Sequence, residues 1–168
     1  MKTLEKTKRA YMGTLSSGSM KTEDILPECI YFLKSIAKDC QITKQVKAIV
    51  AEYNKLEVND NGDYSTDDSH EGMDSAESAE MLLNEDCFNL LNEIAPPYFY
   101  FGSHPGDGAD FGFWLSDGFD MDFDGLKVSD LSEIPKGYTG EILHINDHGN
   151  MSLYYASRGR LREIWAVV

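Results

Sequence analysis

Hydrophobic residues in the first half of the chain recur at the period of an amphipathic helix. Apolar side chains return every three or four positions over residues 25–36, 46–56 and 81–94. Asp74 is placed to cap the last of these helices, and a Pro-Pro pair ends it. Residues 57–74 are polar, acidic and rich in turn formers, which predicts a loop. About three helices are therefore expected before residue 96.

The second half of the chain has the pattern of β-strands. Short aromatic runs at 98–101 and 111–115 are joined by a glycine-rich linker. Farther on, residues 141–145, 151–155 and 161–168 alternate and are separated by turn sequences. These last three segments predict a three-stranded antiparallel meander, and the C-terminal part as a whole is expected to form an antiparallel sheet.

The order of these elements, helices first and strands second, predicts an α+β fold. We expect a flexible basic arm over residues 1–20 and a single domain over 21–168, with a helical part at 21–95 and a β part at 96–168. A chain of 168 residues with 42% hydrophobic residues can bury enough core to fold without disulfides or metal. The three cysteines, Cys29, Cys40 and Cys87, are expected to be buried, reduced thiols.

Negative charge is concentrated in the middle of the sequence. The formal net charge is −14, and residues 51–150 hold 23 acidic and 3 basic side chains, a net of −20, whereas residues 1–50 carry +4 and 151–168 carry +2. Such a field excludes DNA, RNA and anionic membranes as direct ligands and attracts basic surfaces. Two interpretations stay open: an ordinary solvated acidic surface, or a surface shaped to meet a basic partner.

A calcium-loop motif occurs at residues 120–125, where the sequence matches the pattern D-x-D-x-D-G. The twelfth position of such a loop is Leu131, where a calcium site needs a bidentate Glu. Because Phe119, Met121 and Phe123 alternate with the aspartates, a strand with outward carboxylates is favoured over a calcium cage. A calcium-responsive or generic protein-interaction adaptor is kept as an alternative.

On such a strand the carboxylates would follow one another at about 6.6 Å, the same order as the spacing of phosphates along a nucleic acid. The third predicted helix adds acidic positions at Glu77, Glu80, Glu85 and Asp86. The pattern favours a non-enzymatic protein that imitates nucleic acid and binds a basic nucleic-acid-binding protein, with no catalytic residue, cofactor or metal. The predicted partner-binding residues are Asp120, Asp122, Asp124, Asp107, Asp110, Asp67 and Asp68.

Histidines provide an enzymatic alternative. His104, His144 and His148, with nearby carboxylates, have the chemistry of a transition-metal site and predict a metal-dependent hydrolase if the three converge. A hairpin turn is predicted between His144 and His148, and their spacing of four residues does not place both rings on one face of a hairpin as it would on a helix. Convergence of all three is therefore the condition for this alternative.

Two segments carry a resemblance to known proteins: residues 95–114, APPYFYFGSHPGDGADFGFW, and residues 144–150, HINDHGN. They resemble a group of small, largely uncharacterised proteins encoded by bacteriophages, prophages and related mobile elements. The resemblance covers roughly the C-terminal half. It implies a protein made in the cytoplasm of an infected bacterium, and small acidic proteins of this origin are often inhibitors of host defence, of the anti-restriction or anti-CRISPR type. No catalytic residues follow from it.

Overall fold

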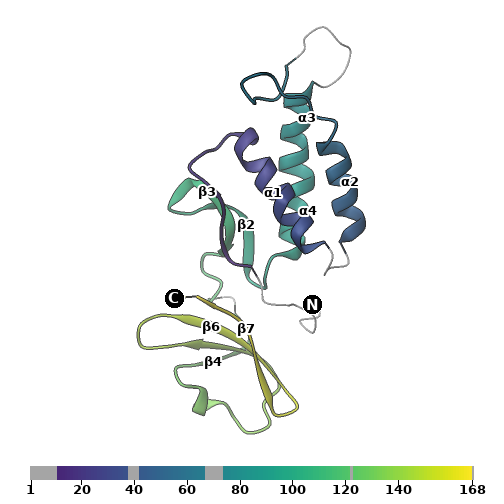
Figure 1. The fold of residues 1–168 in the computed structure, drawn as a ribbon. Coiled ribbons are helices and arrows are strands. Elements are labelled where there is room, and N and C mark those ends of the chain that lie inside the picture. The colour runs from purple at the N-terminus through teal and green to yellow at the C-terminus, as the bar shows by residue number, and fades with distance from the viewer. Residues whose placement is uncertain (1–10, 38–41, 67–73, 122, 168) are drawn as a thin grey trace. The chain divides into compact units, whose positions relative to one another are not determined.

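The computed structural model describes residues 11–37, 42–66, 74–121 and 123–167, and it confirms the α+β class (Figure 1). The chain divides into two compact units. Met12–Leu115 contains the described α-helices and a three-stranded sheet, and we call it the helical unit. Ser116–Val168 contains a four-stranded sheet, and we call it the β unit. In this division the first aromatic strands belong with the helices and not with the later strands.

The helical unit contains the three predicted helices. The first is α1, Thr22–Ile36, and the second is α2, Thr43–Tyr53. The third is continuous from α3, Ser75–Met81, through the π-helix η2, Leu82–Cys87, into α4, Phe88–Ile94. As predicted, Asp74 caps α3, its Oδ1 accepting a hydrogen bond from the Glu77 backbone N–H at 2.8 Å. In Figure 1 these helices run alongside one another, and α1 and α2 both contact η2.

The π-helical segment adjusts the third helix to its core. In a regular α-helix, at 3.6 residues per turn, the buried side chains from Ala79 to Leu91 would spread around about half of the helix circumference. The wider i→i+5 turn at η2 counteracts this drift. The buried residues consequently share one side of the helix: Ala79, Leu82, Leu83, Cys87, Leu90 and Leu91.

A three-stranded antiparallel sheet completes the helical unit. Its strands are β1, Gly13–Ser17, β2, Phe99–His104, and β3, Asp107–Leu115, in the order β1-β3-β2. Residues 1–10 of the predicted flexible arm lie outside the described residues. The prediction of a flexible arm is wrong for Gly13–Ser17, because these residues form β1. This strand pairs with β3, with Gly13 opposite Phe113 and Ser17 opposite Asp110.

Aromatic rings join the helices to this sheet. Phe113 of β3 is 2% exposed, and its ring centroid lies 5.6 Å from that of Phe32 on α1 and 5.2 Å from that of Phe101 on β2. Phe88 of α4 packs edge-on against Phe101 at 5.0 Å and also contacts Phe111 at 6.1 Å. The aromatic runs of the sequence therefore form core, and they fix the face on which the sheet meets the helices.

The β unit contains the predicted three-stranded meander within a larger sheet. Its strands are β5, Gly140–Ile145, β6, Met151–Ser157, and β7, Arg160–Val167, all antiparallel. β4, Leu126–Val128, pairs in parallel with β5, and the short 3₁₀ helix η3, Leu131–Glu133, connects the two. The prediction that the C-terminal part forms one antiparallel sheet is therefore wrong: its described strands belong to two sheets, and one of these has a parallel pair. Among the described residues, no helix combines the length and apolar character needed to cross a membrane.

Asn92 of α4 covers the free edge of strand β2. Its Nδ2 donates to the carbonyl oxygens of Phe88 at 2.9 Å and Phe101 at 3.1 Å, and its Oδ1 accepts from the Phe101 N–H at 2.9 Å. We expect Asn92→Ala to lower the free energy of unfolding by about 1–3 kcal/mol, because two partly buried backbone groups lose their partners.

Urea unfolding measures this change, and Asn89→Ala is the matched control. Asn89 is on the same helix and exposed, and within the described part of the chain it makes no hydrogen bond to the sheet. Because Ala has a higher helix propensity than Asn, Asn89→Ala should be neutral or slightly stabilising, and an equal loss for both variants would contradict the role of the bridge to Phe101.

Candidate functional site

Most of the negative charge belongs to the helical unit. Residues 12–115 contain 19 acidic and 6 basic side chains, a net charge of −13, whereas residues 116–168 contain 9 acidic and 5 basic side chains, a net of −4. The first eleven residues carry +3. The helical unit therefore has the charge expected of an interface with a basic partner.

The aspartates at 120–124 do not form the predicted strand. Residues 117–121 form turns, and the strand that follows begins only at Leu126. Asp120 is half-buried and Asp124 is exposed, while Asp122 lies outside the described residues. Phe119 and Phe123 are buried as expected, with ring centroids 6.5 Å apart, but Met121 is 83% exposed. The prediction of a regular series of carboxylates in this segment is wrong. Phe119 and Phe123 are buried because the chain turns here, not because it alternates as a strand.

A cation from strand β4 contacts the position where the calcium motif begins. Lys127 Nζ donates a hydrogen bond to the backbone carbonyl of Asp120. An ammonium group so close to the first position of the motif opposes binding of a second cation. Within the described ranges, no three His, Cys, Asp or Glu side chains are grouped as a metal site.

Two other predicted partner-binding residues, Asp107 and Asp110, belong to the helical unit. Asp107 is exposed at the start of β3, and its Oδ1 accepts from the Ala109 N–H at 3.0 Å. Asp110 is half-buried: Oδ2 accepts from the Thr14 hydroxyl at 3.2 Å, and Oδ1 is buried without a hydrogen-bond partner among the described residues. Asp110 thus helps to join β1 to β3. Asp67 and Asp68 lie outside the described residues.

An acidic surface follows residues 75–94, which we call the acidic helix. Five exposed carboxylates project from it, and no Lys or Arg occurs anywhere from residue 56 to residue 126. At 1.5 Å per residue the first and last of these carboxylates are about 24 Å apart along the helix axis. They are Glu77, Glu80, Glu85, Asp86 and Glu93.

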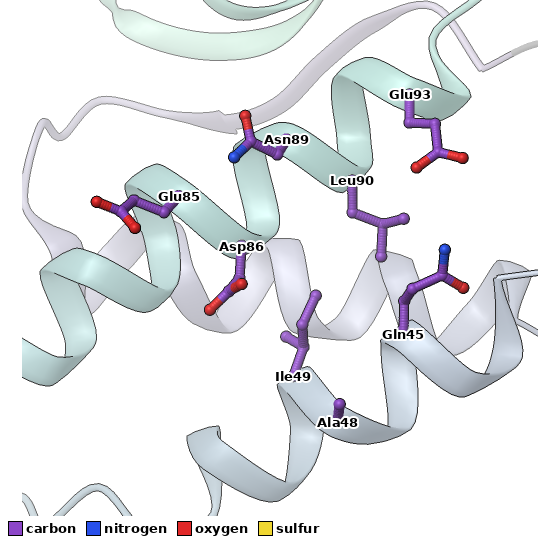
Figure 2. Close-up of a pocket in the computed structure, with 8 residues that line it drawn as sticks. All are labelled: Gln45, Ala48, Ile49, Glu85, Asp86, Asn89, Leu90 and Glu93. Carbon is purple, nitrogen blue, oxygen red and sulfur yellow. The ribbon is translucent and has the colours of Figure 1, made fainter.

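A groove lies between the acidic helix and α2, with a volume of about 300 Å³. Its floor is apolar: Ile49 of α2 and Leu90 of α4 are 6% and 5% exposed. Figure 2 shows Asp86 extending toward Ile49 and Glu93 extending toward Gln45, on either side of Leu90. The remaining lining residues are Ala48, Glu85 and Asn89. Chemically, the groove offers apolar contact in its centre and carboxylate acceptors at both ends.

Part of this surface is predicted by the sequence. Glu77, Glu80, Glu85 and Asp86 were among its acidic positions, but Glu93 and the α2 side of the groove were missed. The long interval without Lys or Arg is the signal that could have led to Glu93. The α2 residues carry no comparable signal, since Gln45 and Ala48 are ordinary exposed helix positions.

The histidines of the hydrolase alternative occupy separate local settings. His104 lies at the end of β2, and its Nδ1 accepts a hydrogen bond from the Gly106 N–H at 3.0 Å. Its ring packs edge-on against Trp114, with the ring centroids 4.6 Å apart. His144 of β5 has its Nε2 3.1 Å from the Ser129 carbonyl oxygen, so this nitrogen acts as a donor. His148 is exposed in the turn after β5. A nitrogen that donates to a carbonyl has no lone pair available for a metal.

Two of the cysteines are buried in the core of the helical unit. Cys29 and Cys87 are both 0% exposed and are free thiols, as predicted, whereas Cys40 lies outside the described residues. Burial raises the pKa of Cys87 to about 12, and burial also raises that of Cys29. Since the thiolate is the reactive form, neither has the chemistry of a catalytic nucleophile.

This burial predicts a thiol titration. In a Cys40→Ser variant, we expect Ellman's reagent at pH 8 to detect no thiol in the folded protein and both remaining thiols in denaturant. Rapid reaction without denaturant would contradict the buried placement of Cys29 and Cys87. Far-UV circular dichroism of the same sample controls for loss of fold.

Comparisons with protein-family models, with curated proteins and with solved structures gave no match. The site is therefore interpreted from its own geometry and charge.

Proposed function

We propose that this protein is a binding protein that inhibits a basic nucleic-acid-binding partner by presenting carboxylates where the partner receives phosphates. One observation supports the proposal above all: the acidic helix exposes five carboxylates over about 24 Å, and it lies in a sequence interval, residues 56–126, without Lys or Arg. The opposite side of that helix is anchored in the core. The carboxylates are thus held on a rigid element.

The density of charge on the acidic helix is compatible with imitation of a phosphate backbone. Five carboxylates over that length give one charge per about 5–6 Å of axis, against one phosphate per about 3.4 Å along a single DNA strand. A Lys- or Arg-lined channel built for phosphates has enough cations to meet each of these groups. The proposal thus replaces the predicted aspartate strand by a helix as the mimicking element.

The strength of the field determines the kinetics that we expect. A net charge of −13 on one unit accelerates encounter with a cationic surface and repels nucleic acid itself. Association is therefore fast and sensitive to salt, and direct binding to DNA, RNA or anionic lipid is not part of the proposal.

The resemblance of residues 95–114 and 144–150 to proteins of phages and mobile elements supports a more specific form of the proposal. In that form the partner is a bacterial defence complex, of the restriction or CRISPR type, and the inhibitor acts in the bacterial cytoplasm. This part of the proposal depends on the resemblance alone.

Affinity capture from a nuclease-treated bacterial lysate tests the proposal. The immobilised full chain is washed at about 0.1 M and then about 1 M salt, over which the Debye length falls from about 10 Å to about 3 Å. We expect basic nucleic-acid-binding proteins to be retained in the first wash and released in the second. Capture of only neutral or acidic proteins, or equal retention at low and high salt, would overturn the proposal.

A further inference from the structure

We infer that the groove between α2 and the acidic helix is the anchoring site for an arginine-bearing amphipathic helix of a protein partner. The inference rests on the proposed function and adds to it the place and the chemistry of contact. It differs from a general attraction of charge, because it requires a specific arrangement of cationic and apolar groups.

The groove has the composition of an anchor site. Its buried floor, Ile49 and Leu90, offers apolar surface at the centre of an otherwise exposed rim. Its volume of about 300 Å³ is at the lower end of the range for ligand sites, so it admits side chains and not a whole helix. An apolar side chain projecting from a partner helix is expected to fill the centre.

The ends of the groove define the charge of the partner. Asp86 and Glu93 flank Leu90 in Figure 2, and none of the eight lining residues is Lys or Arg. Asp86 and Glu93 are seven positions apart, which is about 10 Å along a helix. One cation cannot contact both carboxylates, whereas two cations placed two turns apart on a facing helix can.

This geometry favours arginine over lysine. A guanidinium group is planar, more weakly hydrated than an ammonium group, and able to donate to a carboxylate at two points. Its aliphatic stem can also lie against apolar surface such as Leu90 while its head reaches the rim. The expected partner helix therefore carries Arg at positions i and i+7, with Leu at i+3 or i+4 between them.

A synthetic peptide tests the inference without any cellular partner. The probe is an alanine-based helical peptide with Arg at i and i+7 and Leu at i+3 and i+4, titrated into the isotope-labelled full chain and followed by NMR. We expect shift changes to concentrate on residues lining the groove. A scrambled peptide of the same composition should bind at least about tenfold more weakly, the loss of one or two charge-assisted contacts.

Two matched variants separate the groove from general charge. Ala48 lines the groove and Ala51 does not, and both are exposed positions of α2. Ala48→Lys should weaken peptide binding by about tenfold or more, and Ala51→Lys by less than about twofold, although their net charges are identical. Equal effects of the two variants would overturn the inference.

A charge exchange gives the converse test. In the double variant Asp86→Arg and Glu93→Arg, the Arg peptide should no longer bind, and the same peptide with Glu at both Arg positions should bind instead. Failure of this exchange in a folded variant would also overturn the inference. Because the probe is a peptide, these results are independent of whether the capture experiment finds a nucleic-acid-binding protein, so the two failures are distinguishable.

Discussion

Gly112→Ala should lower the free energy of unfolding of the helical unit by about 3 kcal/mol. Gly112 is buried in β3 opposite Thr14 of β1. A Cβ atom there would lie 2.8 Å from the carbonyl carbon of Gly13 and 2.9 Å from the Cα of Thr14. Both neighbours are backbone atoms and cannot rotate away, so β1 must move from β3.

Gly108→Ala is the matched control for this prediction. Gly108 belongs to the same strand, and its backbone is outside the left-handed region. Apart from its chain neighbours, no described residue has an atom within 4 Å of the Cβ position. Alanine there should be neutral or stabilise by up to about 1 kcal/mol, because it restricts the unfolded chain. Urea unfolding followed by the helical far-UV signal measures both variants, since the described α-helices all belong to the helical unit. Equal stability of the two variants would contradict the close approach of β1 to β3.

Reversing three carboxylates of the acidic helix should weaken partner binding by about 100-fold or more. The variant is Glu80→Lys, Glu85→Lys and Asp86→Lys, all at exposed positions. About 1 kcal/mol lost at each site accounts for a factor of this size. Isothermal titration calorimetry with the captured partner measures the loss.

A variant of the β unit controls for net charge in that experiment. Asp117→Lys, Asp124→Lys and Asp147→Lys also change three exposed carboxylates, so both triple variants have a formal net charge of −8. We expect this variant to retain most of its affinity at moderate salt, because only long-range attraction is reduced. Equal losses would show that binding depends on total charge and not on the acidic helix.

Local patterns predicted the local elements of the fold well. The apolar period located the three helices, Asp74 provided the expected cap, and the turn sequence after β5 defined the β5–β6 hairpin. Strand β1 was missed, because Gly13–Ser17 has little apolar alternation and its partner strand β3 is about a hundred residues away in sequence. Pairing between such distant segments depends on the tertiary packing, which local periodicity does not report.

The candidate site was predicted less well, for a related reason. Counting charges located an acidic region, but alternation of Phe and Asp at 119–124 was interpreted as a strand when a turn buries both rings. The groove needs residues from α2 and from the acidic helix, which adjoin only in the folded unit. The π-helical turn has no sequence signature of its own, yet it brings Leu82, Cys87 and Leu90 to one side of the helix.

Competition between this protein and DNA for the captured partner tests the central claim most directly. A fluorescent DNA duplex is bound to the partner at low salt, and the unlabelled full chain is added while anisotropy is recorded. If the acidic helix occupies the phosphate-binding surface, the anisotropy should fall to the value of free DNA. A stable complex containing the partner, the DNA and this protein together would contradict the claim.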